Sequence, residues 1–158
     1  MDMDAVEIIK LMLAPGVMVN SCGLFLLGMN NKYSVVVGRI RSLDEEKRKL
    51  IVTQHSGKLS EHETKRLASI NKQIGKLTYR VKLVRNAVVS YTVAVAFFII
   101  NCIVIGINSL SHNENSYGFL ATVLFFIGLL FVFAGVAYAT KEVMKGYEIV
   151  KIEVADFD

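Results

Sequence analysis

The sequence predicts an all-α integral membrane protein with three transmembrane helices, the first two of which extend into a long antiparallel cytoplasmic helical hairpin. Three observations indicate this fold class: three long blocks without charged residues, a basic segment between the first two blocks, and a regular apolar repeat along that segment. A length of 158 residues suits one domain. We therefore expect a single membrane domain over residues 1–158.

The three charge-free blocks are long enough to be membrane spans. They run from Leu11 to Met29, from Asn86 to Leu110 and from Tyr117 to Thr140. Each has about the 20 residues that a helix needs to cross a bilayer, whereas a helix of that length in a soluble protein normally has a charged face. We place the spans at about residues 11–30, 86–108 and 117–140.

Pro15 leaves the start of the first span open between two alternatives. Proline cannot donate the helix hydrogen bond to the residue four positions before it. Either a helix starts near residue 5, with Asp4 and Glu7 at capping-box spacing, and kinks around residues 11–15. Or residues 5–13 form a short external helix and Pro15 opens the span. The acidic start "MDMDAVEIIK" lacks the basic region of a signal peptide, so we expect the first span to be retained.

The distribution of basic residues predicts the orientation. The segment from Asn30 to Arg85 holds fourteen of the eighteen Lys and Arg residues and only five acids, whereas the second connection, "SHNENSY", has no Lys or Arg. Loops rich in Lys and Arg stay on the cytoplasmic side. We expect the N-terminus outside, and both the hairpin and the C-terminal tail (residues 141–158) in the cytoplasm.

The segment of about residues 31–85 has the pattern of a helical hairpin. Apolar residues at alternating spacings of three and four form an a/d seam in each half. Ser60 and Glu63 form a capping box that starts the second arm near residue 61, and the arm from Asn30 to Gln54 has 25 residues, as does that from Glu61 to Arg85. Equal arms predict an antiparallel pair with a turn near residues 55–60. The seam residues are Leu26, Met29, Tyr33, Val36, Ile40, Leu43 and Leu50 in the first half, interrupted at Lys47, and Leu67, Ile70, Ile74, Leu77, Val81, Val84 and Val88 in the second.

Basic residues gather where both arms meet the membrane. We expect them to form a collar that attracts anionic lipids of the inner leaflet, at about 1 kcal/mol for each charge near the surface. Because these charges follow the topology and no recognition motif accompanies them, we expect no nucleic acid as a partner. The collar consists of Lys32, Arg39 and Arg41 on the first arm and Arg80, Lys82 and Arg85 on the second.

Every span has a face of small residues. Lipid gives helices no hydrophobic reason to associate, so close packing at small residues matters. Either the three helices of one chain pack on these faces, or copies of the chain associate; together with a further apolar column at Leu83, the faces favour a homo-oligomer. The close-packing residues are Ala14, Ser21 and Gly28 in the first span, Ser90 and Ala94 in the second, and Gly128 and Gly135 in the third.

Asparagines are the polar side chains expected to matter inside the spans. Asn20 is near the centre of the first span, and Asn101 and Asn108 lie on one face of the second. An unsatisfied amide in lipid costs several kcal/mol, so each should have a partner. Asn20 and Asn101 have similar expected depths and can meet. The asparagines are either interhelical contacts, within or between chains, or the lining of a pore.

The sequence lacks the residue patterns that indicate catalytic, metal or proton-transfer sites. No Asp, Glu, Lys, Arg or His lies inside a span, which argues against a proton relay. The sequence has no Walker loop, no HExxH and no nucleophile elbow, so we predict no catalytic residue, no metal site, no cofactor and no enzyme. We expect Cys22 and Cys102 to be reduced thiols within spans.

Two stretches resemble a known family. They are "LMLAPGVMVNSCGLFLLGMNNKYSVVVGRIRSL", with Arg39, Ile40, Arg41 and Leu43 in a basic motif, and "YRVKLVRNAVVSYTVAVAFFI". They resemble a family of small bacterial membrane proteins catalogued only as a domain of unknown function. Members commonly have an Asp before the basic motif, where this chain has Gly38. The resemblance implies three spans and the bacterial inner membrane, and no activity.

Two functions follow from these expectations. The first is a homo-oligomeric inner-membrane protein that forms a pore or ion-channel-like assembly. The second is a non-conducting scaffold or accessory subunit whose coiled-coil hairpin docks a cytoplasmic partner protein. Seams that face only each other favour the pore, whereas an apolar stripe left exposed on the hairpin favours the scaffold.

Overall fold

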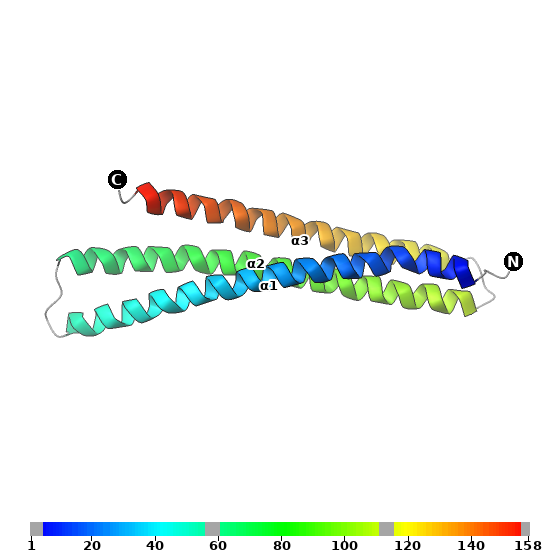
Figure 1. Ribbon diagram of the computed structural model, residues 1–158, viewed down its shortest axis with the longest axis horizontal. Coiled ribbons are helices and arrows are strands. Elements are labelled where there is room, and N and C mark those ends of the chain that lie inside the picture. Colours follow the sequence, from blue (N-terminus) through cyan, green and yellow to red (C-terminus); the bar gives the residue numbers. More distant parts are fainter. Residues whose placement is uncertain (1–4, 56–60, 111–115, 156–158) are drawn as a thin grey trace. The chain divides into compact units, whose positions relative to one another are not determined.

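The chain is helical throughout the residues that the structure describes. The computed structural model describes residues 5–55, 61–110 and 116–155. They form α1 (Ala5–His55), α2 (Glu61–Leu110) and α3 (Ser116–Ala155) (Figure 1). Each of the three helices is long and apolar enough to span a membrane. The expected all-α architecture with three span-forming helices is confirmed, and it fits a multi-pass membrane protein.

The lengths of α1 and α2 exceed what a bilayer can cover. They have 51 and 50 residues, and at 1.5 Å per residue each is about 75 Å long. The hydrocarbon core of a bilayer is only about 30 Å thick. Part of each helix must therefore lie outside it, as the charged arms of the sequence require.

The ends of the helices lie close to the expected positions. α1 ends at His55 and α2 starts at Glu61, where the sequence places the ends of the two arms. The turn between them and the capping residue Ser60 lie outside the described residues. Pro15 is inside α1, which begins at Ala5 and continues without a break. Pro15 therefore does not begin a helix, and the alternative of a separate external helix is wrong.

The contacts of the chain divide it into two compact units. Unit 1 comprises residues 1–29 and 86–138, and unit 2 comprises residues 30–85 and 139–158. The boundary at residues 29 and 30 coincides with the end of the first charge-free block. The division therefore places almost all of the three charge-free blocks in unit 1 and the basic segment between residues 30 and 85 in unit 2.

Unit 1 has a small apolar core that includes aromatic rings. Cys22, Ala94 and Phe98 are buried together. The rings of Phe25 and Tyr91 are stacked with centroids 5.3 Å apart. Partly buried residues pack around this core, and they are Met18, Val19, Val95, Phe125 and Val132.

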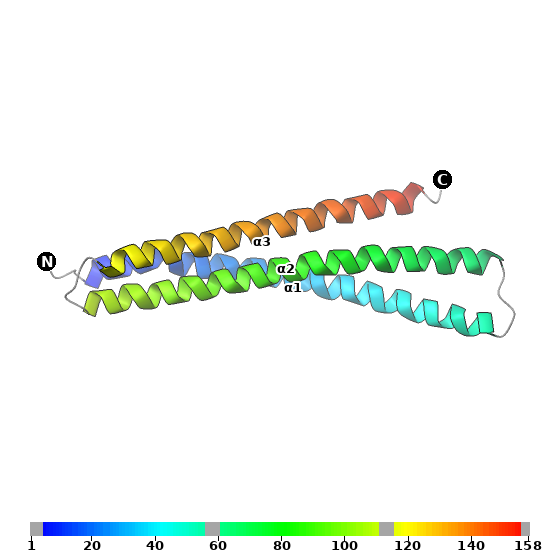
Figure 2. The same cartoon turned by 180° about the vertical axis from the view of Figure 1, so that it is seen from behind.

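Unit 2 is organised around the apolar seam. Val36 and Leu43 of α1 form a buried cluster with Ile70 and Leu77 of α2. Figures 1 and 2 show these parts of α1 and α2 side by side. The predicted seam residues Ile40, Leu50, Ile74 and Val81 pack against the cluster. The heptad spacing thus correctly predicts the packing of these eight residues, whereas Tyr33, which it also placed in the seam, is 40% exposed.

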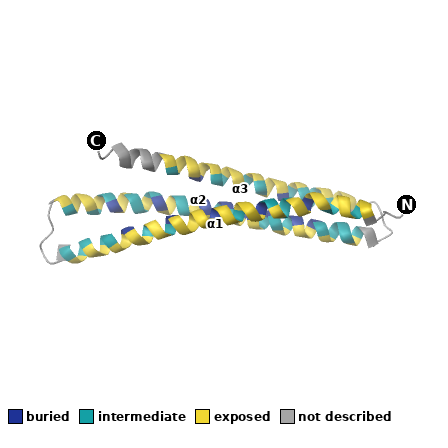
Figure 3. Ribbon diagram, viewed as in Figure 1, coloured by how far each residue is buried: buried dark blue, intermediate teal, exposed yellow. Residues whose placement is uncertain are grey.

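Large apolar side chains remain exposed along the span-forming helices. Figure 3 shows exposed residues, in yellow, along much of each helix. Leu27 of α1 and Phe133 of α3 are 70% and 72% exposed. A soluble monomer rarely exposes large contiguous apolar patches. Lipid accounts for such a surface, because exposed apolar side chains on a membrane-spanning helix face hydrocarbon.

Candidate functional site

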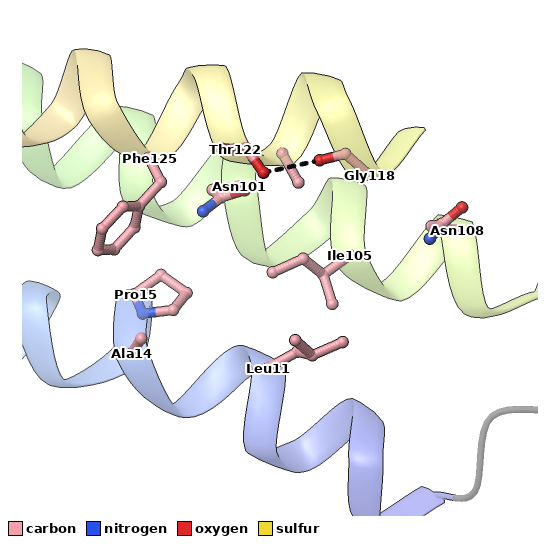
Figure 4. A pocket seen from close by; sticks show the side chains of 10 residues that line it. Leu11, Ala14, Pro15, Asn101, Ile105, Asn108, Gly118, Thr122 and Phe125 are labelled. Carbon is pink, nitrogen blue, oxygen red and sulfur yellow. Dashed lines mark hydrogen bonds between the residues drawn. The ribbon is translucent and has the colours of Figure 1, made fainter. Parts of the chain in front are cut away.

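A pocket in unit 1 brings two of the three predicted asparagines together. Asn101 and Asn108 of α2 both line it (Figure 4). The pocket has a volume of about 260 Å³. Its other lining residues come from all three helices and are Leu11, Ala14, Pro15, Ile105, Gly118, Ala121, Thr122 and Phe125. The seven-residue spacing of the two asparagines therefore correctly predicts that they share one face.

The side-chain oxygens of both pocket asparagines lack hydrogen-bond partners. Asn101 is 2% exposed, and its Oδ1 atom, like that of Asn108, is buried and unpaired. The nearby hydroxyl of Thr122 donates instead to the backbone oxygen of Gly118, at 3.0 Å. An unsatisfied buried acceptor costs about 1–3 kcal/mol. Two residues that line the pocket therefore carry buried acceptor atoms, and a donor that reached either atom would remove this cost.

Asn20 lies apart from this pocket. It is exposed on α1 and lines a different, open groove together with Ile9, Met12, Leu13, Gly16 and Val17. No hydrogen bond joins it to Asn101 in the described part of the chain, where the Asn101 oxygen is unpaired. The expected Asn20–Asn101 contact within one chain is therefore absent. Equal depth along two helices does not place two side chains on facing sides.

The small residues of α2 and α3 make close contacts. A Cβ atom added at Gly128 would lie 2.8 Å from Cε1 of Phe98, and one added at Gly135 would lie 2.8 Å from Cε1 of Tyr91. Ala94 is fully buried in the core of unit 1. The glycines let aromatic rings of α2 approach the backbone of α3, which is the kind of close packing expected in a membrane.

The small residues of α1 behave differently. Ala14 and Gly28 are exposed, and nothing lies within 4 Å of a Cβ added at Gly28. Ser21 is half-buried and its hydroxyl donates to the backbone oxygen of Val17. Ser90, on α2, is buried and donates to the backbone oxygen of Asn86. The predicted close-packing face of α1 is thus largely open within one chain.

Unit 2 contains a buried carboxylate. Glu142 of α3 is 1% exposed. Its Oε1 atom accepts from Nη2 and Nε of Arg80, at 2.6 and 3.2 Å, and its Oε2 atom accepts from Nζ of Lys32, at 3.1 Å. Both carboxylate oxygens are therefore paired, as a buried charge requires. We call Lys32, Arg80 and Glu142 the ion cluster.

The ion cluster changes the interpretation of the basic collar. Two of its six members, Lys32 and Arg80, bind Glu142 and are partly covered by it. The remaining four are exposed, and contact between them and lipid headgroups stays a prediction. They are Arg39, Arg41, Lys82 and Arg85.

Sequence reasoning missed Glu142, although the spacing that reveals it is present. Gly128 and Gly135 are seven residues apart, and seven more residues lead to Glu142. All three are buried. Because residues seven apart share a helix face, continuing the repeat beyond the third span would have predicted a buried acid.

The described part of the chain contains neither a disulfide nor a group of side chains arranged as a metal site. Cys22 and Cys102 are free thiols, the first buried and the second half-buried. No group of three or more His, Cys, Asp or Glu side chains is arranged to hold a metal ion among the described residues. The pocket and the ion cluster are therefore the two polar features that require an explanation.

Comparison with known proteins assigns the family. Residues 12–152 match DUF2721, a family described as protein of unknown function. The chain belongs to this family. The match covers all three helices and confirms the resemblance seen in the two sequence stretches. No curated protein and no solved structure matches the chain.

Proposed function

We propose that this member of the DUF2721 family is a multi-pass protein of the bacterial inner membrane that forms a homo-oligomer through α1, with a pore-like path at Asn20. The hairpin arms and the C-terminal tail lie in the cytoplasm in this proposal. The excess of Lys and Arg between residues 30 and 85 supports that orientation. The pore is a conducting path for small polar solutes or ions.

The two cytoplasmic arms form an antiparallel hairpin in this proposal. Two contacts of unit 2 support it. Lys32 and Arg80 bind the same carboxylate, and Glu46 binds Arg66. From residue 32 to residue 46 the number rises by fourteen on α1, and from residue 80 to residue 66 it falls by fourteen on α2. Residue numbers that rise along one helix and fall along its neighbour are expected when the two helices are antiparallel.

The exposure of Asn20 is the observation that carries the oligomer proposal. Asn20 lies between Gly16 and Gly23, and a Cβ added at either glycine meets nothing within 4 Å. The face is open, yet an amide exposed to hydrocarbon costs several kcal/mol. A second copy of the chain would cover this face and provide Asn20 with a hydrogen-bond partner. Its glycines allow the two helices to approach closely, and its own Asn20 both donates and accepts hydrogen bonds.

The packing of the seam favours the pore over the scaffold. The seam residues of α1 and α2 cover one another in unit 2. Leu83, which the sequence offered as a further apolar column, is 6% exposed and therefore already covered within the chain. The arms thus retain little of the continuous apolar stripe that a docking partner would need. Asn20 lines the path, whereas Asn101 and Asn108 lie in the pocket of unit 1.

The scaffold remains a second candidate because of one exposed patch on α3. Val143, Met144 and Tyr147 are 53%, 64% and 73% exposed in unit 2. Their spacing places them on one side of the helix. A cytoplasmic partner protein that docked here would need no conduction through the membrane.

The proposed function is tested by measuring mass and flux together. The purified protein is reconstituted in nanodiscs for mass determination and in liposomes for an ion-flux assay. We expect an oligomer that conducts, and Asn20→Leu should shift it toward monomer and reduce flux at least tenfold. Asn101→Leu, the same substitution on the face that lines the pocket, is the matched control and should change neither.

Two results would contradict this function. A monomer that carries no flux would leave the scaffold as the better candidate, to be tested by whether Tyr147→Ser prevents recovery of a cytoplasmic partner. A conducting oligomer that Asn20→Leu leaves unchanged would show that the path lies elsewhere.

A further inference from the structure

A residue that lines the pocket of unit 1 has a backbone carbonyl without its ordinary helix donor. Leu11 and Pro15 both line it. In a helix, the carbonyl of residue 11 accepts from the amide of residue 15, but proline has no N–H to donate. Pro15 is fully buried within the continuous helix α1. The Leu11 carbonyl therefore loses its ordinary donor at the pocket.

The lining of the pocket excludes charged ligands. No lining residue carries a charge, so neither a cation nor an anion would find a counter-charge there. An unpaired ion in an apolar site costs far more than a neutral group. Apart from the asparagines and Thr122 the walls are apolar, and Figure 4 shows Phe125 near Pro15 and Ile105 near Leu11. A ligand of this pocket is therefore neutral and largely apolar.

The unpaired asparagine oxygens indicate that the ligand should also donate a hydrogen bond. The Oδ1 atoms of Asn101 and Asn108 are buried without partners. They are seven residues apart, which is about 10 Å along α2, so a single small group reaches one of them. Asn101 is the more deeply buried of the two. A ligand that donates one hydrogen bond to Asn101 relieves the larger desolvation cost.

The volume limits the size of the ligand. A protein cavity of about 150 Å³ holds benzene, and this pocket has about 260 Å³. A single substituted aromatic ring fits, whereas a whole phospholipid does not.

We propose that this pocket is a binding site for a small neutral phenol or a similarly sized apolar alcohol. The ring packs between Pro15 and Phe125, and the hydroxyl donates to Oδ1 of Asn101. The site is independent of the proposed path at Asn20, which lies in a different groove. Binding would also tie α1, α2 and α3 together within unit 1, because all three contribute to the lining.

The test compares two probes that differ only in the donor. The full-length protein in nanodiscs is titrated with 4-(trifluoromethyl)phenol or with 4-(trifluoromethyl)toluene, in which a methyl group replaces the hydroxyl. Fluorine NMR follows each probe, and displacement by excess 4-methylphenol separates site binding from partition into lipid. We expect the phenol to bind about five times more tightly than the toluene, because one hydrogen bond contributes roughly that factor.

Three variants link the binding to the pocket. Asn101→Leu should reduce the preference for the phenol to less than twofold, while circular dichroism confirms that the protein is still helical. Ala121→Phe should fill the pocket and abolish displaceable binding of both probes. Asn20→Leu should leave binding unchanged even where it alters the oligomer, so the two proposals fail separately.

The proposal is overturned by any of three results. They are the absence of displaceable binding, equal affinity for the two probes, and a preference for the phenol that survives Asn101→Leu. A site that holds lipid chains alone would give the second result.

Discussion

The two units solve the same packing problem with different interactions. In unit 1, glycines let aromatic rings approach the backbone, as at Gly128 and Phe98, and buried amide oxygens are left unpaired. In unit 2, an apolar seam joins α1 and α2, and the buried Glu142 carboxylate is paired at both oxygens. Unit 1 thus combines tight apolar contacts with unmet polar groups, whereas unit 2 satisfies its most buried charge.

This difference follows from the solvents that we propose for the two units. Water drives apolar side chains together, so a heptad seam is sufficient to join two helices in unit 2. Hydrocarbon does not, so the helices of unit 1 depend on close approach at small residues. The comparison shows that Asn101 and Asn108 differ from the other buried polar groups, because their side-chain oxygens have no hydrogen-bond partner. Every other buried polar feature described above has a partner, so the pocket is where an external ligand is expected.

The largest effect should come from a cavity in the seam. Leu43 is 1% exposed in the cluster of unit 2. Leu43→Ala should lower the free energy of unfolding by about 3 kcal/mol. Hydrogen exchange would reveal the loss as faster exchange in both arms. Val35→Ala, at a neighbouring position that is 66% exposed, should change exchange little; equal effects of the two would show that the seam is not the core of unit 2.

Removing the buried carboxylate should have a nearly equal effect. Glu142→Gln leaves Lys32 and Arg80 without their counter-charge and should cost about 3 kcal/mol, as breaking a buried ion pair does. Exchange should increase on α3 from residue 139 onward. The double variant Glu142→Leu/Arg80→Leu replaces the carboxylate and one of its partners by apolar side chains. It should recover much of the stability that Glu142→Gln loses. If the double variant loses as much free energy of unfolding as Glu142→Leu and Arg80→Leu lose together, a direct interaction between Glu142 and Arg80 is contradicted.

The close approach in unit 1 should give a smaller effect. Gly128→Ala places a Cβ 2.8 Å from the Phe98 ring, and overpacking of this kind costs about 2 kcal/mol. Unfolding by a denaturing detergent, followed by circular dichroism, would measure it. Gly75→Ala is the control, because nothing lies within 4 Å of its Cβ; it should be neutral or slightly stabilising. If Gly128→Ala is equally harmless, the helices of unit 1 are less tightly packed than described.

The exposed ion pair of the arms should matter least. Arg66 donates to both carboxylate oxygens of Glu46, at 2.8 and 3.1 Å, but both side chains are more than 40% exposed. Surface pairs contribute at most about 1 kcal/mol. Glu46→Gln should therefore change stability far less than Glu142→Gln when both are measured by the same exchange experiment, and the small effect should vanish in high salt. A larger loss for Glu46→Gln would reverse the comparison between buried and exposed charges.

The sequence predicts the helices and their apolar contacts well. Charge-free blocks give the three span-forming helices because lipid excludes ionisable residues over a fixed length. The heptad spacing gives the contacts around Val36, Leu43, Ile70 and Leu77, because the helix period fixes which side chains share a face. The same reasoning places Asn101 and Asn108 together. Local periodicity is sufficient for each of these features.

The sequence does not predict which side chains of different helices contact each other when no repeat links them. The depth of Asn20 and Asn101 could be estimated by counting residues, but the rotation of α1 about its axis could not, so the expected contact is absent within the chain. Glu142 directly follows a charged residue after the third span, which is also how a solvated tail begins. Its burial depends on Lys32 and Arg80, which are 110 and 62 residues away in sequence. No local pattern encodes that pairing.

The position of Glu142 also has a consequence for biosynthesis. The ribosome makes Lys32 and Arg80 long before Glu142, which belongs to the last of the three helices. The ion cluster can therefore close only after residue 142 has been translated. A nascent or truncated chain that ends before residue 142 carries the two basic side chains without the acid that neutralises one of their charges. The completed cluster thus distinguishes a chain translated through residue 142 from a shorter one.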